Sequence, residues 1–442
     1  SVSALAEALR QSGAAEPRRN AIWALTRIEG EQARAAVRGV LNDGEESVRQ
    51  AAIHSASAWR DAAALPQLLD TLKSGSPQLQ RAAAEALGRI GDKSAVAQLL
   101  AVAGAQHDRV LEHSLIYALI EIADPTGTVH GFAAATPQAK RAALIALDQM
   151  DGGDLRPEMV TPLLVSSEPL LKQTAWWIAG HHPEWGPKLA GFFHRRLADP
   201  NLSPAEREEL QGQLAQFGRN EAIQELLAAT AGGAVSKESR VTALGAMARV
   251  GLKKTSPAWL AALVRVLGEK DDQLVRHAVA AARALPASKE GAPDLSAALL
   301  GVARDATAPR EIRLDALAAI PGGLASPDPE LFDFLCASIE PAQQPAVRSA
   351  AAGVLAKAKL SREQLLALTD SLKSAGPMEL TQLLPAFDNG SDEALGLKLV
   401  AALKDSKGRS NLRADLVKAR LAKYPESVRK QGEELLVSLD MD

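Results

Sequence analysis

The residue types that most often carry chemistry gather in one short stretch of the sequence, TAWWIAGHHPEWG. Its adjacent histidines, His181 and His182, have imidazole nitrogens that could ligate a metal ion. A stable metal site needs a third and a fourth ligand, and Glu184 is the one local candidate. Pro183 follows the pair and indicates a helix end, where histidines interact with the helix dipole and cap the last carbonyls. We therefore predict a capping role for this pair and no metal site.

Other side chains that could act as acid, base or nucleophile have simpler structural interpretations. His113, Tyr117 and Glu121 recur at every fourth residue and share a helix face, but acid–base catalysis also needs a pocket that excludes water. We expect these three to form an exposed polar face. His54 stands where most related segments have alanine, so we expect a buried histidine with one hydrogen bond. Cys336 has no His or Asn nearby in the sequence and is interpreted as a core thiol.

Composition and motifs exclude several classes of function. The 442 residues include 50 basic and 53 acidic ones, so no global charge favours nucleic acid or anionic lipid. One cysteine excludes a disulfide framework, a cysteine-based zinc site and a CxxCH haem attachment within this chain. The sequence has no P-loop, GxSxG or HExxH motif, and its most apolar stretch, 95–105, is too short to span a membrane. The chain opens at Ser1 without the pattern of a signal peptide, so its compartment is not indicated. We predict no enzyme activity, no cofactor, no binding of nucleic acid and no membrane insertion.

The decisive feature of the sequence is an internal repeat. The segments 18–28, 80–92, 112–124 and 140–152 each place Ala, Leu and Ile at helical spacing and close with Gly, Asp or a short apolar residue. Shorter amphipathic helices are predicted between them, over 62–73, 94–103, 157–165 and 186–197. Related helices are predicted later, over 240–250, 274–285, 310–320, 346–357 and 427–439. A helix pair that recurs every 30 to 40 residues or so predicts an all-α fold, an α-solenoid built as a superhelix of helix-pair repeats.

The repeat is more regular in one half of the chain than in the other. Residues 1–199 are predicted to form an arm of regular repeats, and residues 200–442 a continuous second arm of longer, divergent repeats. The segment ADPNLSP, 198–204, is the predicted seam between the arms.

Equivalent positions of the repeats separate a buried stripe from an exposed ridge. Positions equivalent to Ala86 and Leu87 are apolar in most repeats and form the buried stripe. Positions equivalent to Arg81, Glu85 and Arg89 follow one another at every fourth residue and form the exposed ridge on another face of the helix. The middle row of this ridge reads Trp23, Ile53, Glu85, Tyr117, Ile145, Trp177. The row before it in the helices reads Arg19, Arg49, Arg81, His113, Arg141, Gln173. The row after it reads Arg27, Ser57, Arg89, Glu121, Gln149, His181. In the second half the corresponding rows contain no aromatic side chain. They read Arg276/Ala280/Ala284, Arg313/Leu317/Pro321 and Arg348/Ala352/Ala356.

Trp, Tyr and Arg are the favoured anchors of protein interfaces, so the first-half ridge is a candidate partner-binding groove. The predicted binding residues are Arg19, Trp23, Arg27, Arg81, Glu85, His113, Tyr117, Glu121, Arg141, Trp177 and His181. The alternative is that these side chains pack against the neighbouring repeat, with arginine stems covering apolar surface. Full burial of Trp23, Tyr117 and Trp177 would favour that alternative.

The segment RAAAEALGRIGD resembles the bacterial HEAT-like repeat family, which includes the phycobilin-lyase type. LEHSLIYALIEIADP, RAALIALDQMDGG and AWWIAGHHPEWG resemble the HEAT segment of large planctomycete-type proteins described as membrane-bound dehydrogenases with a cytochrome-c-like haem-binding domain. This closer resemblance covers about residues 15–200, and the flanking propeller and haem domains of that group are absent here. It implies a scaffold for a protein partner or for neighbouring domains within a larger redox assembly, in the periplasm or cell envelope. The alternatives are a bilin-lyase-like or DNA-glycosylase-like enzyme on the same scaffold, and a purely structural spacer.

Overall fold

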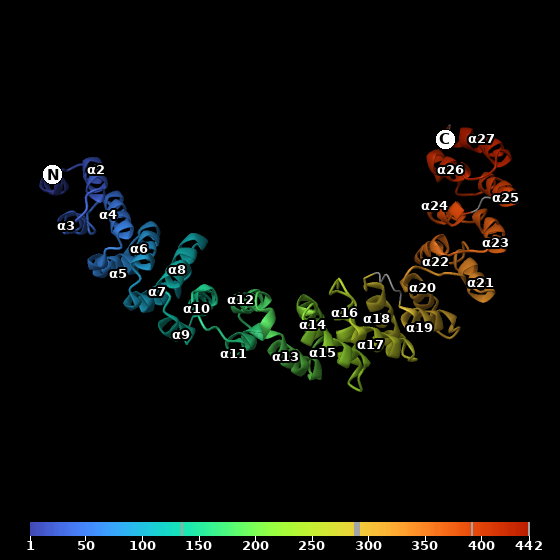
Figure 1. The fold of residues 1–442 in the computed structure, drawn as a ribbon, viewed down its shortest axis with the longest axis horizontal. Helices are drawn as coiled ribbons and strands as arrows, with labels where there is room; N and C mark the ends of the chain where they lie inside the picture. Colours follow the sequence, from blue (N-terminus) through green and yellow to red (C-terminus); the bar gives the residue numbers. More distant parts are fainter. Residues whose placement is uncertain (134–135, 287–291, 390–391, 441–442) are drawn as a thin grey trace. The chain divides into compact units, whose positions relative to one another are not determined.

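A computed structural model describes residues 1–133, 136–286, 292–389 and 392–440. Over these ranges the ordered elements are α-helices and short 3-10 helices, with no strand, and none of the helices described is long and apolar enough to cross a membrane (Figure 1). The chain divides into two compact units, Ser1–Trp185 and Gly186–Asp442. In each unit consecutive helices alternate between two rows, which is the arrangement of an α-solenoid.

In the first unit, the longer helices form one row in which each helix packs on the next (Figure 1). This row consists of α2 (Ala15–Thr26), α4 (Glu46–Trp59), α6 (Pro77–Ile90), α8 (Arg109–Ile122), α10 (Pro137–Gln149) and α12 (Pro169–Gly180). The other row consists of α1 (Val2–Gln11), α3 (Glu31–Arg38), α5 (Leu65–Ser74), α7 (Val96–Ala103), α9 (Pro125–Phe132) and the short α11 (Pro157–Val160). The predicted helices over 62–73, 94–103 and 157–165 correspond to α5, α7 and α11 with their adjoining 3-10 turns.

Local sequence signals explain where these helices begin and how closely they pack. The side chains of Ser76, Asp108 and Thr136 cap the first turns of α6, α8 and α10 by accepting backbone N–H groups. Small residues let the helices of the long row approach each other. A Cβ added at Gly88 of α6 would lie 2.9 Å from the Cα of Ala118 in α8, so only glycine allows this contact.

In the second unit the same alternation continues to the end of the chain. One row consists of α14 (Pro204–Phe217), α16 (Lys237–Met247), α18 (Asp272–Arg283), α20 (Arg310–Ala319), α22 (Pro345–Lys357) and α24 (Pro377–Leu383). The other consists of α13 (Gly186–Ala198), α15 (Glu221–Gly232), α17 (Pro257–Leu267), α19 (Pro293–Arg304), α21 (Pro329–Ser338), α23 (Arg362–Leu372) and α25 (Glu393–Lys404), followed by α26 (Ala414–Leu421) and α27 (Glu426–Asp440). Large apolar side chains, Trp259, Phe193 and Phe387 among them, are fully buried in this unit.

The segment 198–204, where the sequence places the seam, is the loop from α13 to α14, and both helices belong to the second unit. The rings of Phe193 in α13 and Phe217 in α14 lie 6.0 Å apart, and this contact ties α13 to the helices that follow it. The division between the units therefore falls one helix earlier than the seam, after Trp185.

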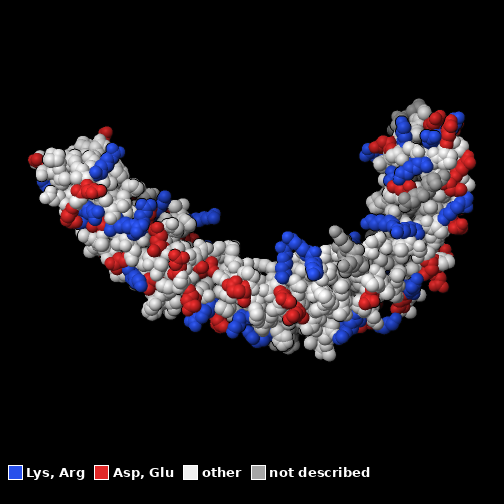
Figure 2. Space-filling model, viewed as in Figure 1, with Lys and Arg blue, Asp and Glu red and all other residues white. Residues whose placement is uncertain are grey.

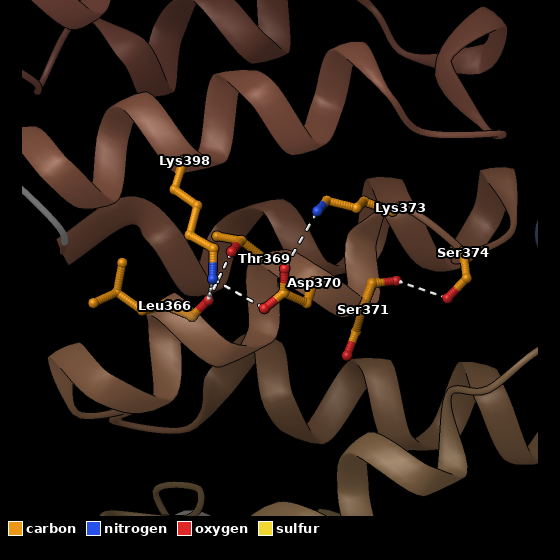
Figure 3. Close-up of polar contacts among 7 residues, drawn as sticks. All are labelled: Leu366, Thr369, Asp370, Ser371, Lys373, Ser374 and Lys398. Atoms are coloured by element: carbon orange, nitrogen blue, oxygen red, sulfur yellow. Dashed lines mark hydrogen bonds and ion pairs between the residues drawn. The ribbon is translucent and has the colours of Figure 1, made fainter.

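Polar side chains also join helices of one row, as Figure 3 shows for α23 and α25. The ammonium of Lys398 in α25 donates to the carbonyl of Leu366 and to the carboxylate of Asp370, both at 2.9 Å. Lys373 approaches the same carboxylate at 3.4 Å. Hydrogen bonding to Lys398 is the main cause that lowers the pKa of Asp370. The lysines and the aspartate satisfy one another, so this cluster is structural.

Candidate functional site

The long helices of the first unit share one numbering that separates structural positions from exposed ones. Counted from the first residue of each helix, position 4 of α2 and of α6 carries a side chain that reaches the loop or helix end before it. Arg18 of α2 donates to the Ala14 carbonyl, and Gln80 of α6 donates to the Leu72 carbonyl at the end of α5. These carbonyls have no partner within a helix, so the side chains satisfy otherwise orphaned acceptors. We call positions 5, 9 and 13 of the long helices the ridge. Residues at these positions point away from this contact, and they lie in α2, α4, α6, α8, α10 and α12.

Three aromatic rings at position 9 of the ridge are exposed. Trp23 is 43% exposed, Tyr117 49% and Trp177 43%, so none of the three rings is buried between repeats. Exposed tryptophan and tyrosine are unusual in a chain that has only 15 aromatic residues. The ridge therefore presents large apolar surfaces to solvent.

Each of these rings has a histidine beside it. The ring of Trp23 meets that of His54 edge-on at 5.4 Å between centroids. Tyr117 stacks with His113 on its own helix at 6.2 Å, and Trp177 lies 4.8 Å from His181. These ring contacts restrict the orientations of the aromatic side chains, so less conformational entropy is lost when a partner covers them.

The charged ridge residues divide into paired and unpaired groups. Arg19 donates to Ser47 at 2.9 Å, Arg141 pairs with Glu112, and Glu85 pairs with Arg89 at 3.0 Å. Arg27, Arg81 and Glu121 are exposed and form no ion pair within the described residues. All of the predicted binding residues are exposed or half-buried, and they lie on successive helices of one row. The structure thus brings the predicted set together on one face.

The predicted register is wrong in α4. Ile53 was expected on the ridge, but it is fully buried, and Ser57 is also in the interior. The ridge positions of α4 are instead Gln50, His54 and Ala58, all of them exposed. The sequence alignment matched Arg49 to Arg81, whereas α4 begins at Glu46 and Arg49 therefore occupies position 4. Counting from the helix start, rather than matching arginines, would have found the correct register.

The same shift corrects the prediction for His54. We expected a buried histidine, but the side chain is exposed and packs against Trp23 of the preceding long helix. It stands where other repeats carry Glu85 or Tyr117, which are also on the surface. Gln50 and His54 are therefore candidate functional residues that the sequence alignment missed.

The second-unit rows predicted from the sequence are also corrected in part. Arg313 and Arg348 occupy position 4: Arg313 donates to the Ala303 carbonyl at 2.7 Å, and Arg348 pairs with the buried Glu379 at 3.0 Å. The residues four positions later, Leu317 and Ala352, are consequently buried rather than exposed. These two arginines therefore serve structural contacts within the second unit.

The adjacent histidines at the end of α12 have different roles. Nδ1 of His181 lies 2.7 Å from the Trp177 carbonyl in the last turn, a capping contact as the sequence predicts. His182 lies 2.6 Å from the carboxylate of Asp148 at the end of α10 and 2.5 Å from that of Glu184, and it stacks on Trp185. Burial alone lowers the pKa of His182, but the two carboxylates outweigh it and raise the pKa above its ordinary value. This histidine clamps neighbouring repeats together.

No other chemistry is assembled in the part of the chain that the structure describes. It contains no group of three or more His, Cys, Asp or Glu residues that could hold a metal ion. Cys336 is half-buried in α21, and burial raises the pKa of its thiol to about 11, so the thiolate is disfavoured at neutral pH. His113, Tyr117 and Glu121 lie on an exposed helix face.

Comparison with known proteins supports the repeat architecture. Residues 2–78 and 56–120 match the family model described as HEAT repeats, so this part of the chain carries HEAT repeats. Curated proteins give no match. The crystal structure of Kap121p bound to Ste12p is similar over 99% of this chain and 51% of that chain, with 14% sequence identity and a TM-score of 0.50. That of importin beta is similar over 99% of this chain and 71% of that chain, with 12% identity and a TM-score of 0.43. At these identities the likeness concerns the fold alone.

Proposed function

We propose that this protein is a non-enzymatic HEAT-repeat scaffold whose first unit binds a protein partner along the ridge. The observation that carries the proposal is the exposure of Trp23, Tyr117 and Trp177 at one helix position, each with a histidine beside it. Aromatic side chains dominate the hot spots of protein interfaces because they bury large areas at a low cost in rotamer entropy.

The size of the expected effect supports this role. A partner that covered the exposed part of each ring would bury roughly 100 Å² per residue. At about 25 cal/mol per Å² each ring would then contribute about 2.5 kcal/mol to binding. Three such anchors on one face are sufficient for a specific interface, and the surrounding charged residues would form its polar rim.

The proposal is tested by capture from a lysate of the source cells with immobilised full-length chain. The test variant combines Trp23→Ala, Tyr117→Ala and Trp177→Ala. The matched control combines Val110→Ala, Val129→Ala and Val165→Ala, which removes exposed apolar side chains of the same unit outside the ridge. We expect quantitative mass spectrometry to show a protein that the wild type and the control retain and the test variant loses.

A protein captured equally by all three forms would place binding outside the ridge and contradict the proposal. No captured protein at all would favour the structural spacer. A bilin-lyase-like or glycosylase-like enzyme is disfavoured because the described residues form no enclosed acid–base or nucleophilic constellation. Activity on a tetrapyrrole or on damaged DNA would overturn the non-enzymatic proposal.

We also propose that the scaffold works within a larger redox or haem-protein assembly. The support for this finer proposal is the sequence resemblance over about residues 15–200, and no comparison adds to it. It predicts that the ridge-dependent partner contains haem or another redox group. A Soret band in the captured material, absent from that of the triple ridge variant, is the expected result, and a partner without a redox group would contradict it.

A further inference from the structure

A small recess opens beside the ridge between α4 and α6. Its volume is about 180 Å³, several times the roughly 30 Å³ that one water molecule occupies in the liquid, so it can hold a side-chain-sized group. The lining is polar apart from one alanine and consists of Gln50, His54, Ser57, Gln78, Arg81, Ala82 and Glu85.

Ser57 gives this recess a buried polar group without a partner. The residue is only 3% exposed, and its Oγ forms no hydrogen bond. A second buried serine of the same helix is fully satisfied, because Ser55 Oγ donates to the Ala51 carbonyl at 3.1 Å and meets Thr26 at 2.6 Å. An unsatisfied buried hydroxyl is costly, and its position in the wall of an open recess leaves it available to a water molecule or to a ligand atom.

The charges around the recess favour an anionic ligand. Arg81 is exposed at its mouth and makes no hydrogen bond or ion pair within the described residues. The one carboxylate of the lining, Glu85, is paired with Arg89 at 3.0 Å. The side chains of Gln50 and Gln78 add amide donors. Figure 2 shows basic and acidic side chains interleaved over the first unit, so the positive charge at the recess is local.

We propose that the recess receives the carboxylate of an Asp or Glu side chain from an acidic segment of the protein partner. The Arg81 guanidinium pairs with the carboxylate at the mouth, and the Ser57 hydroxyl donates to it from within. His54 lines the recess and contacts Trp23, so the carboxylate site adjoins the first aromatic ring of the ridge. This inference rests on the proposed function and names the chemistry of its partner.

The test measures binding of fluorescein-labelled octaglutamate to the full chain by fluorescence anisotropy at low salt. Octaglutamine and an eight-nucleotide oligothymidylate serve as neutral and phosphate-bearing probes. The variants are Ser57→Ala and Arg81→Gln, with Arg10→Gln as a control that removes one exposed charge of the first unit outside both the ridge and the recess. We expect octaglutamate to bind at least tenfold more tightly than either other probe. Ser57→Ala and Arg81→Gln should each weaken it about tenfold, and Arg10→Gln less than twofold.

Equal losses for Arg81→Gln and Arg10→Gln would show that the binding reflects general electrostatics and would overturn the proposed carboxylate site, as would no effect of Ser57→Ala. Tighter binding of the oligothymidylate would instead assign the surface to nucleic acid. The thermal midpoint of Ser57→Ala should equal or exceed that of the wild type, which separates lost binding from lost folding. If the aromatic triple variant loses the lysate partner while Ser57→Ala keeps it and leaves octaglutamate binding unchanged, this inference fails and the proposed function stands.

Discussion

The two units place opposite kinds of side chain at the centre of the same helix face. Position 9 of the long helices in the first unit reads Trp23, His54, Glu85, Tyr117, Ile145 and Trp177. Position 9 in the second unit, from α14 to α22, reads Gly212, Gly245, Ala280, Ala318 and Gly353. The helix pairing is the same in both units, so the fold itself does not require a large side chain there.

Open space at two of the small residues strengthens this conclusion. A Cβ added at Gly212 or Gly353 would meet no atom within 4 Å, so packing leaves room for a side chain at these two positions, whereas one added at the buried Gly245 would clash with Oε1 of Gln211. The aromatic rings of the first unit are therefore additions to a common scaffold. They leave 43–49% of each residue exposed to solvent, which is the pattern expected of a binding surface.

The largest expected difference between the two units is in the free energy of unfolding when one tryptophan of each unit is replaced by alanine. Trp259 of α17 is 1% exposed, and its indole N–H donates to the Gln224 carbonyl at 2.9 Å. We expect Trp259→Ala to lower the free energy of unfolding by about 3–5 kcal/mol. Trp177→Ala should lower it by less, by about 1–2 kcal/mol, because 43% of that residue is exposed to solvent. Urea denaturation followed by circular dichroism measures both, and equal losses would show that the ridge aromatics are structural.

A smaller effect distinguishes the arginines of position 4 from those of the ridge. Arg240 of α16 donates to both carboxylate oxygens of Glu269, at 3.0 and 2.6 Å, and to the Ala231 carbonyl at 2.8 Å. Removing this partly buried network by Arg240→Ala should cost about 1–3 kcal/mol of unfolding free energy. Arg27→Ala on the ridge should change it by less than about 0.5 kcal/mol. The same denaturation measurement checks both, and a cost at Arg27 comparable to that at Arg240 would contradict the separation of positions.

The smallest effect is a pH dependence of opposite sign in the two units. In the first unit the pKa of His182 is raised, so the folded state binds this proton more tightly than the unfolded chain. Its stabilisation is complete below the ordinary histidine pKa and is lost as pH rises through the raised value. In the second unit burial, aided by Arg276, lowers the pKa of His277. The stability of that unit therefore falls as pH drops below the ordinary histidine pKa.

The contributions of the two histidines to stability are measured separately by comparing His182→Gln and His277→Gln with the wild type at pH 5.5 and pH 8. We expect His182→Gln to remove a stabilisation of at most about 1 kcal/mol at the lower pH. His277→Gln should remove a destabilisation of the same order at that pH. Differences in thermal midpoint between the two pH values, taken for each variant against the wild type, provide the measurement. A shift of the same sign in both variants would contradict these assignments.

Sequence periodicity predicted the helices closely because it reflects local chemistry. The predicted segments 310–320 and 346–357 differ from α20 and α22 by a single residue at one end. The exposed face was also found in five of the six long helices of the first unit, since positions 5, 9 and 13 follow from 3.6 residues per turn. The error in α4 arose because Arg49 and Arg81 look equivalent in the sequence although they stand one position apart in their helices.

The sequence by itself determined the all-helical repeat, the alternation of helix lengths and the unequal distribution of aromatic residues between the halves. Local propensity, capping residues and helical spacing are sufficient for these features. Only the tertiary structure decided which arginines satisfy the carbonyls of a preceding helix, that His54 meets Trp23, and that Ser57 is buried without a partner. The contact of His54 with Trp23 joins repeats about 30 residues apart, whereas Arg313 reaches a carbonyl 10 residues before it. A displacement of one residue along a helix turns a side chain by about 100°. Of two residues adjacent in the sequence, one can therefore lie on the surface and the other in the core. The packing between helices determines which of them is buried.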